Sequence, residues 1–193
     1  ILGPDARFGL LEGVLSTRAG YAGGTKDHPT YHDLGDHTET VLIEYDPGLI
    51  SFEQLLNLFW NGHAPGFRPW KRQYQSLLFY FNDEQKRQAL ASRERFAKQT
   101  GTPLFTEILP AGRFYTAEEY HQKYYLKRYR DLLREFLNIY PSPEGLLSST
   151  AAARVNGYAG GYGTYDTLQG EMETLGLSAH AQRILNGIVM GEY

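Results

Sequence analysis

The 193-residue sequence contains no cysteine. That absence excludes disulfide bonds, zinc–thiolate sites and thiol chemistry within these residues. No apolar run approaches the roughly 18–20 residues that cross a bilayer, and the N-terminus lacks the basic and apolar segments of a signal peptide. The first residue is Ile1, and we expect encoded residues upstream of it. We also expect no membrane partner and a cytoplasmic location.

The sequence also lacks a large excess of acidic or basic residues. The formal net charge is −3 and the pI is about 6.1, whereas nucleic-acid binding needs a concentrated basic face. Basic residues between 127 and 134 are interspersed with acidic ones, which is typical of a solvated helix face. His121 and Glu118 have helical spacing but no third ligand nearby, so we predict no metal site. Nucleic acid and metal are therefore not expected partners.

Hydrophobic periodicity alternates between helix and strand spacing along the chain. Ser51 followed by Gln54 has the spacing of a capping box and predicts a helix start. We predict helices at 4–16, from Ser51 onward, at 83–98, 116–126 and 128–138, strands at 37–46, 75–81 and 104–109, and an extended segment from residue 17 that leads into a glycine turn ending at 24.

The order of these elements indicates an α+β fold, an α/β two-layer sandwich in which helices flank a mixed sheet with one parallel crossover. Residues 1–140 form the predicted main domain. Residues 141–193 form a helical C-terminal extension packed on the same domain, after a linker at 138–150 and with loops around the glycines at 157–163. Gly-Tyr-Ala-Gly-Gly occurs at 20–24 and again at 157–161, but the flanking sequences differ, so we interpret this as coincidence.

Short runs in the first two thirds of the chain, in register with one another, resemble the A-type peptide-methionine sulfoxide reductase family. Each run is weak alone, but their common order and spacing are specific. They are Gly13-Val14, Thr17, Gly20-Tyr21-Ala22-Gly23-Gly24, Pro29-Thr30-Tyr31, His37-Thr38-Glu39, Tyr45-Asp46-Pro47, Ile50-Ser51, Leu55-Leu56, Phe59-Trp60, Gln73-Tyr74, Ser76, Thr106-Glu107-Ile108, Phe114-Tyr115 and the run from Ala117 to Tyr124. The resemblance covers about residues 3–126 and implies a ferredoxin-like fold of that family.

The resemblance implies a catalytic site with one acid and two phenols. The family's catalytic acid falls on Glu39, and its two sulfoxide-binding tyrosines fall on Tyr31 and Tyr74. A buried carboxyl group that stays protonated can donate to the sulfoxide oxygen. From spacing alone, Glu39 is more typical of a solvent-facing strand residue, Tyr74 of a surface or edge residue and Tyr31 of loop packing.

Further site residues follow from the same resemblance. The family carries its nucleophilic cysteine in a Gly-Cys-Phe-Trp-Gly run at the head of the first helix, and Gly3 matches the last glycine of that run. The nucleophile is thus expected immediately before Ile1, with Ile1, Leu2 and Gly3 beside the substrate. Tyr21 and His37 are further candidates for substrate binding. His37 either orients the acid or is a half-exposed strand residue.

Four positions and one loop depart from the family pattern. Ile1 and Leu2 replace an aromatic pair, which leaves an apolar wall without a flat aromatic face. Pro69 stands where the family has an acidic residue five positions before the second tyrosine, and Ala64 stands at another position that is usually acidic. The segment from Phe67 to Arg72 is aromatic and basic instead of glycine-rich and acidic.

Two functions of different classes fit these residues. The first is reduction of methionine S-sulfoxide, free or in peptides and proteins, by a monomer that needs no bound cofactor. An external thiol reductant, thioredoxin or similar, then closes the cycle. The second is a catalytically inactive protein that binds methionyl sulfoxide or a similar peptide ligand. A purely structural interaction domain is a third interpretation. The residue encoded before Ile1 discriminates between the first two.

Overall fold

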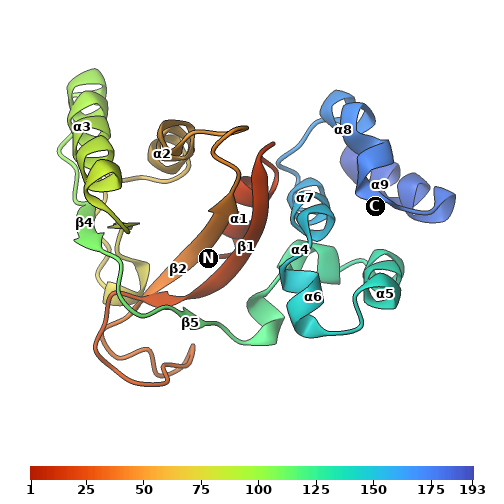
Figure 1. Ribbon diagram of the computed structural model, residues 1–193, viewed down its shortest axis with the longest axis horizontal. Helices are drawn as coiled ribbons and strands as arrows, with labels where there is room; N and C mark the ends of the chain where they lie inside the picture. Colours follow the sequence, from red (N-terminus) through yellow and green to blue (C-terminus); the bar gives the residue numbers. More distant parts are fainter. The chain divides into compact units, whose positions relative to one another are not determined.

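The computed structural model describes residues 1–193, which divide into two compact units (Figure 1). The first unit comprises residues 1–19, 41–46 and 118–193, and the second comprises residues 20–40 and 47–117. The chain contains both helices and β-sheets, so the predicted α+β class is confirmed. None of the helices combines the length and the apolar character that a membrane span requires.

The elements follow one another in a regular order along the chain. They are α1 (Leu2–Gly9), β1 (Val14–Ala22), β2 (Thr38–Tyr45), α2 (Phe52–Asn61), η1 (Arg72–Tyr74), β3 (Leu77–Tyr80), α3 (Asp83–Thr100), β4 (Glu107–Pro110), β5 (Tyr115–Thr116), η2 (Glu119–His121), α4 (Tyr124–Lys127), α5 (Arg130–Ile139), α6 (Pro143–Leu147), α7 (Thr150–Ala159), α8 (Tyr165–Glu171), η3 (Met172–Leu175) and α9 (Ala179–Met190).

The strands form two small sheets (Figure 1). One has the order β2-β1-β5, and its β1 and β5 are antiparallel, with Tyr21 opposite Tyr115. The other pairs β3 with β4 in parallel, starting with Leu77 opposite Glu107. The parallel pair is joined by α3, which is the long crossover that parallel strands require.

The core of the second unit lies between α2, α3 and β3. Ser51 caps α2 in the predicted capping box with Gln54. The apolar stripe of this helix then buries Leu56 and Trp60 against Leu78 and Ala89. The Trp60 indole donates to Ser92 Oγ at 2.8 Å, so its one polar atom is satisfied inside the core.

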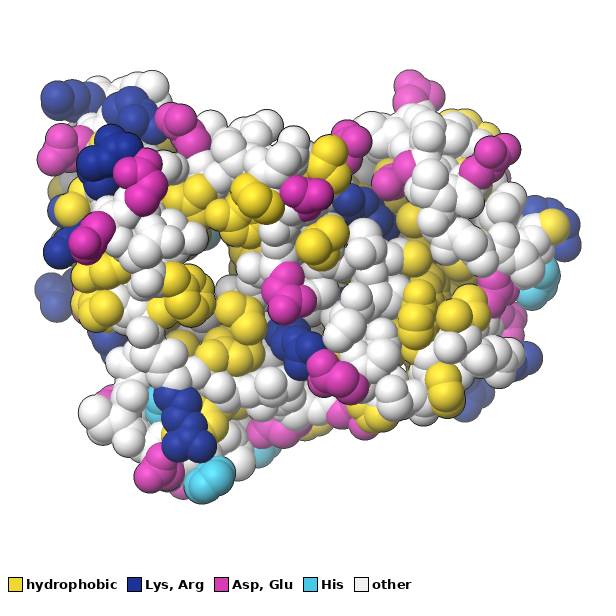
Figure 2. All heavy atoms as spheres, in the orientation of Figure 1, with side chains coloured by type: hydrophobic (Ala, Val, Ile, Leu, Met, Phe, Trp, Pro, Cys, Tyr) yellow, Lys and Arg dark blue, Asp and Glu magenta, His cyan; other side chains and the backbone are white.

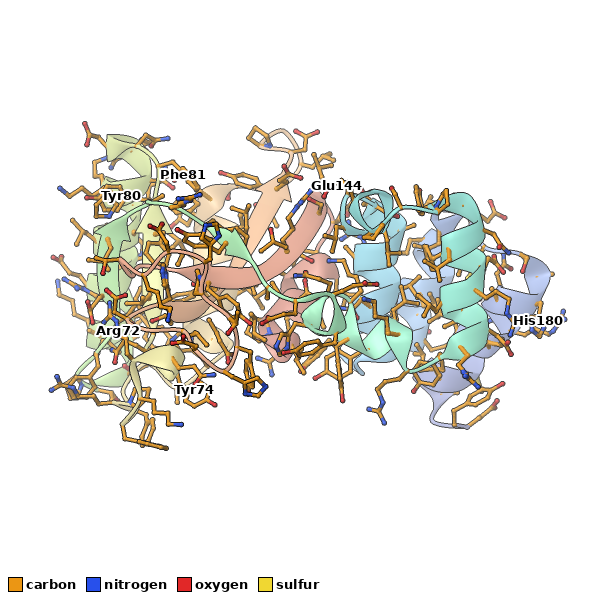
Figure 3. All side chains as sticks on the ribbon, turned by 90° about the horizontal axis from the view of Figure 1, so that it is seen from below. Arg72, Tyr74, Tyr80, Phe81, Glu144 and His180 are labelled. Atoms are coloured by element: carbon orange, nitrogen blue, oxygen red, sulfur yellow. The ribbon has the colours of Figure 1, made fainter.

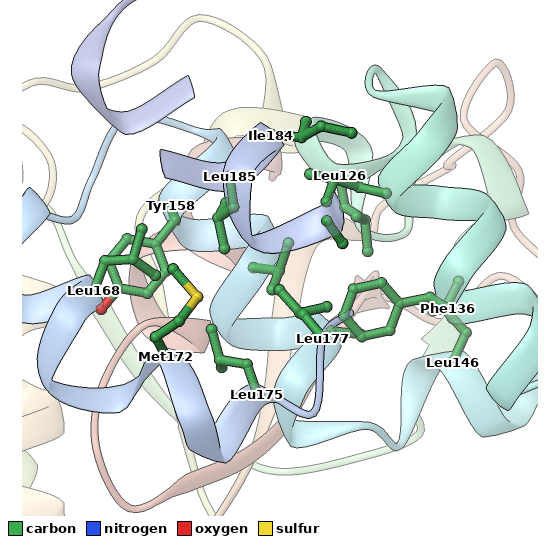
Figure 4. Packing of buried hydrophobic residues seen from close by; sticks show 14 residues of the cluster. Leu126, Phe136, Leu146, Tyr158, Leu168, Met172, Leu175, Leu177, Ile184 and Leu185 are labelled. Carbon is green, nitrogen blue, oxygen red and sulfur yellow. The ribbon is translucent and has the colours of Figure 1, made fainter. Parts of the chain in front are cut away.

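The core of the first unit is made by the short helices of its C-terminal part. Leucines from several of these helices meet Phe136, Tyr158 and Met172 in one buried cluster (Figure 4). Serine or threonine precedes four of the helices and accepts a hydrogen bond from the third helical N–H. Such caps define the ends of helices that are too short to be stable through propensity alone. The predicted helical character of the last fifty residues is confirmed.

Several predicted boundaries are wrong, each for a local reason. The first helix ends at Gly9 instead of residue 16, and β1 begins at Val14, directly after a left-handed turn at Gly13 (φ 89°). No continuous helix spans 116–126, because Lys123 adopts φ 49°, a left-handed conformation that a helix cannot contain. The strand predicted at 104–109 is β4, which starts at Glu107.

The C-terminal boundaries also differ from the prediction. The expected linker at 138–150 contains the end of α5 and all of α6. Gly157 lies inside α7 instead of in a loop. A Cβ at this position would approach Ala6 O to 2.8 Å. The glycine is therefore required by the close contact between α1 and α7. The two Gly-Tyr-Ala-Gly-Gly runs have unrelated structures, one largely strand and the other the end of a helix.

Candidate functional site

One carboxyl group and two phenols come together in the second unit. Glu39 is the second residue of β2, Tyr74 ends η1, and Tyr31 lies in the turn between β1 and β2. The Tyr74 hydroxyl shares a side-chain hydrogen bond with Tyr31 and feels the charge of Glu39. Gln73 Nε2 donates to Glu39 Oε1 at 2.8 Å. The three residues that the resemblance singled out are therefore neighbours in space.

Backbone contacts hold the segments that carry these side chains. Thr38 Oγ1 donates to Arg72 O at 2.8 Å and so joins the start of β2 to η1. Thr30 and Asp33 pair through two backbone hydrogen bonds, which close the turn that contains Tyr31. Hydrogen bonds made by the sequence neighbours of Tyr31, Glu39 and Tyr74 thus hold the segments that carry these three side chains. Such support from adjacent backbone keeps the side chains in a defined arrangement.

The phenol of Tyr74 is the most perturbed group of this site. Its pKa is raised above the ordinary tyrosine value, first because the ring is partly withdrawn from water, then through the hydrogen bond with Tyr31 and the negative charge of Glu39. The hydroxyl is consequently protonated across the neutral range and is a hydrogen-bond donor. Tyr74 is 49% exposed, so a small ligand can reach it from solvent.

His37 and Tyr21 do not reach the surface of this site. They are 0% and 1% exposed, respectively, so His37 is not the half-exposed strand residue that one interpretation predicted. His37 Nδ1 accepts from Gly24 N at 3.1 Å and its Nε2 lies 2.7 Å from Lys26 O, which fits the neutral ring with its proton on Nε2. His37 therefore holds the glycine turn after β1 and supports the site from behind.

The head of α1 lies in the first unit, where C-terminal residues pack on it. Ile1, Leu2 and Gly3 are half-buried. A Cβ at Gly3 would lie 3.0 Å from the hydroxyl of Tyr162, and the Arg7 guanidinium lies 4.9 Å from the centre of the same ring. This contact is not predictable from the sequence alone, because residues 140–193 contribute little to the resemblance.

A buried polar network around Asp5 holds α1 in place. Asp5 Oδ1 accepts from Thr17 Oγ1 at 2.5 Å and lies 3.3 Å from Lys123 Nζ, and Asp5 Oδ2 accepts from Asn156 Nδ2 at 3.1 Å. Lys123 is fully buried, and desolvation lowers its pKa despite the opposing effect of Asp5. Its ammonium also donates to Thr17 O at 2.6 Å. An ion pair with this many hydrogen bonds fixes the register of the elements it joins.

Helix α7 also contacts the other end of α1. Arg154 Nη1 donates to Gly9 O at 2.7 Å, and Arg154 Nε pairs with Glu171 at 3.3 Å. The C-terminal part of the chain thus contacts both the first turn and the last turn of α1. Thr17 and Lys123 belong to the runs that carry the resemblance. No sequence pattern indicates that Lys123 is left-handed or that these residues are buried together, since tertiary contacts determine both.

The remaining histidines form no metal centre. No group of three or more His, Asp or Glu side chains is close enough to hold an ion. His63 Nδ1 lies 2.7 Å from Phe59 O and its Nε2 lies 2.6 Å from Ser76 Oγ, so it closes the end of α2.

An α+β fold with an acid and two phenols in contact is the arrangement expected of a sulfoxide-binding protein. The family model described as "Peptide methionine sulfoxide reductase" matches residues 2–143, and the model "Selenoprotein methionine sulfoxide reductase A, helical domain" matches residues 142–190. The chain belongs to the peptide methionine sulfoxide reductase family.

Relatives and solved structures agree with this assignment. A peptide methionine sulfoxide reductase of Drosophila melanogaster is 46% identical over 178 residues, which cover 91% of this chain and 71% of the relative. Peptide methionine sulfoxide reductase A5 of Oryza sativa is 45% identical and covers 80% of this chain, but only 63% of that relative is spanned. The structure of methionine sulfoxide reductase A of Corynebacterium diphtheriae is 32% identical with a TM-score of 0.56, over 65% of this chain and 69% of that chain.

Proposed function

We propose that this protein reduces the S epimer of methionine sulfoxide, free or within peptides, in a thiol-dependent reaction. The observation that carries the proposal is the hydrogen bond between Tyr31 and Tyr74 close to the Glu39 carboxyl group, in a member of this family. The two phenolic hydroxyls and the carboxyl group can supply hydrogen bonds and a proton to a single strongly polarised oxygen, because all three lie close together. An apolar thioether product has no use for these donors, so they favour the sulfoxide over methionine.

Glu39 acts as the general acid in this proposal. Gln73 Nε2 donates to one of its carboxyl oxygens and so orients the group toward its role. Tyr31 and Tyr74 donate to the sulfoxide oxygen and stabilise the charge that grows on it as sulfur is attacked. Glu39 then delivers a proton to that oxygen.

The nucleophile of the proposed reaction stands immediately before Ile1, at the head of α1. The positive end of a helix dipole lowers the pKa of a thiol or selenol there and favours the reactive anion. Its attack on the substrate sulfur transfers the oxygen, so that methionine is released and a sulfenic or selenenic acid forms. Two equivalents of external thiol then restore the nucleophile, with release of water and a disulfide.

The remaining parts of the proposal concern partners. The substrate is methionine sulfoxide in a peptide or protein, and the reductant is thioredoxin or a similar thiol. Ile1 and Leu2 form the apolar wall for the S-methyl group. The protein acts as a monomer. His37 and Tyr21 shape the site through the turn that they support, not through contact with the substrate.

The experiment is a gain of activity in the chain itself. One variant carries a single cysteine immediately before Ile1, and its matched control carries serine there. We expect the cysteine variant to reduce the S epimer of N-acetylmethionine sulfoxide with dithiothreitol and the serine control to be inactive. Binding of the sulfoxide without turnover by the folded cysteine variant would instead support the inactive binding protein.

A further inference from the structure

A cavity of about 510 Å³ opens beside the proposed site, within the second unit. Its walls include the side chains of Trp70 and Phe105, and its polar groups come from Arg68, Arg72 and Glu107. The loop from Phe67 to Arg72 that forms much of it is the segment in which the sequence departs from the family. The volume lies within the range of ligand pockets and is enough for one or two side chains.

The cavity carries an excess of positive charge. Arg72 Nη1 is neutralised by Glu107 Oε1 at 2.6 Å. Arg68 is exposed and has no acidic partner, and the Lys71 ammonium lies 4.6 Å from the centre of the Trp70 ring. Two cations therefore remain to be paired. A carboxylate that entered the cavity would meet the Arg68 guanidinium, a group that binds carboxylates through two parallel hydrogen bonds.

The aromatic wall of the cavity is open to solvent. Trp70 is 83% exposed, whereas Trp60 is 2% exposed and belongs to the core. Pro69 restricts the backbone before Trp70, so little conformational freedom is lost when the ring is covered. An exposed tryptophan beside an arginine is a typical anchor for a polypeptide segment. Acidic side chains on the face drawn in Figure 2 are interspersed with basic ones.

The short helix η1 joins the cavity to the proposed catalytic site, because Arg72 begins it and Tyr74 ends it. Arg72 and Gln75 line the cavity, whereas Gln73 contacts Glu39 and Tyr74 contacts Tyr31. Arg72 and Tyr74 are near each other at one edge of the molecule (Figure 3). An extended peptide advances by about 3.3 Å per residue, and η1 spans only three residues, so we expect a side chain two or three positions from the sulfoxide to lie beside the cavity.

We infer that this cavity is a subsite for polypeptide substrates that carry an acidic side chain two or three residues from the methionine sulfoxide. The inference rests on the proposed function, because that function places the sulfoxide at Tyr74. The carboxylate pairs with Arg68, and the neighbouring peptide backbone and side chains cover Trp70. Oxidised methionines in acidic segments are thus preferred over those in basic segments.

A fluorescence titration tests this inference without turnover, because the 193 residues hold no thiol and cannot consume the substrate. Three peptides are compared, identical except for Glu, Gln or Lys two residues from one methionine sulfoxide. We expect the Glu peptide to bind about threefold more tightly than the Gln peptide, and the Lys peptide more weakly, with the differences lost near 1 M salt. The signal comes from Trp70, so Trp70→Phe should abolish it.

A charge reversal supplies the decisive comparison. Arg68→Glu should invert the order of the Glu and Lys peptides, whereas Arg183→Glu, an equal change of charge on α9, should keep it. Because each order is measured within one variant, a partial loss of folding does not mimic the result. Equal binding of the three peptides, or an unchanged order in Arg68→Glu, would overturn the inference. Failure of the cysteine variant to reduce N-acetylmethionine sulfoxide would instead overturn the proposed function.

Discussion

Asn156 in α7 donates from its amide to Asp5 in the first turn of α1, across 151 residues of sequence. The same side chain accepts from the backbone N–H groups of Tyr125 and Leu126. One fully buried amide therefore satisfies three polar groups from two other helices. The C-terminal part of the chain is thus bound into the folding unit that contains α1, and its loss is expected to disturb the helix that carries the proposed nucleophile.

Asn156→Ala should destabilise the protein strongly. It leaves a buried carboxylate oxygen and two buried N–H groups without a partner, and each unsatisfied group costs about 1–3 kcal/mol. We expect a loss of at least about 2 kcal/mol in the free energy of unfolding, measured by urea denaturation. Asn61→Ala is the matched control, because Asn61 is exposed and bonds only to Asn57 O in its own helix. A similar loss in both variants would contradict the role given to Asn156.

Two glycines inside helices predict opposite effects of the same substitution. A Cβ at Gly157 would approach Ala6 O and Leu10 Cβ to 2.8 Å, so Gly157→Ala should force α1 and α7 apart and lower the melting temperature. A Cβ at Gly170 in α8 meets nothing within 4 Å. Gly170→Ala should therefore stabilise by roughly 0.5–1 kcal/mol through helix propensity. Thermal unfolding of the two variants measures the contrast, and a change of the same sign in both would refute it.

Tyr158 predicts a specific dependence of stability on alkaline pH. Burial and the hydrogen bond to Glu171 raise its pKa to about 12 in the folded protein. Because an unfolded tyrosine titrates near 10, the unfolded state loses its proton first, and stability falls between about pH 10 and 12. Tyr158→Phe removes this contribution. The difference in unfolding free energy between the parent and the variant should shrink by up to about 2–3 kcal/mol across that window. A constant difference would contradict the assignment.

The proposed sulfoxide contacts predict the effect of removing single hydroxyl groups. In the chain with cysteine before Ile1, Tyr31→Phe and Tyr74→Phe each remove one donor to the sulfoxide oxygen. Each should lower kcat by about 10²-fold, the lower end of the range for a lost oxyanion donor. Tyr80→Phe is the control, since Tyr80 lies on β3 and contacts Lys86. Full activity in both Tyr31→Phe and Tyr74→Phe would remove these tyrosines from the site.

The sequence predicts local features well and tertiary ones poorly in this protein. The capping box at Ser51 and the strand at 37–46 depend on a few adjacent residues, and both are confirmed. The left-handed Lys123 and the glycine inside α7 depend on partners more than a hundred residues away, so no local pattern predicts them. Glu39, Tyr31 and Tyr74 were identified through the resemblance, because their spacing alone is more typical of ordinary surface or packing residues than of a catalytic site.

The cavity beside Arg68 shows the limit of such a resemblance. The family pattern marks the loop from Phe67 to Arg72 only as a departure, and its basic and aromatic composition gains meaning from the fold. Parallel pairing of β3 with β4 brings Glu107 beside Arg72, and the loop before β4 brings Phe105 to the same cavity. Loop and strand are more than thirty residues apart in sequence. Their meeting is a property of the topology.

Glu39 provides the most direct test of the whole account. In the chain with cysteine before Ile1, Glu39→Gln keeps the size of the side chain and removes the acid. We expect kcat for the S epimer of N-acetylmethionine sulfoxide to fall by roughly 10²-fold or more, whereas Glu44→Gln on the same strand leaves it unchanged. An active parent whose rate is retained in Glu39→Gln would contradict the proposal that this carboxyl group protonates the sulfoxide oxygen.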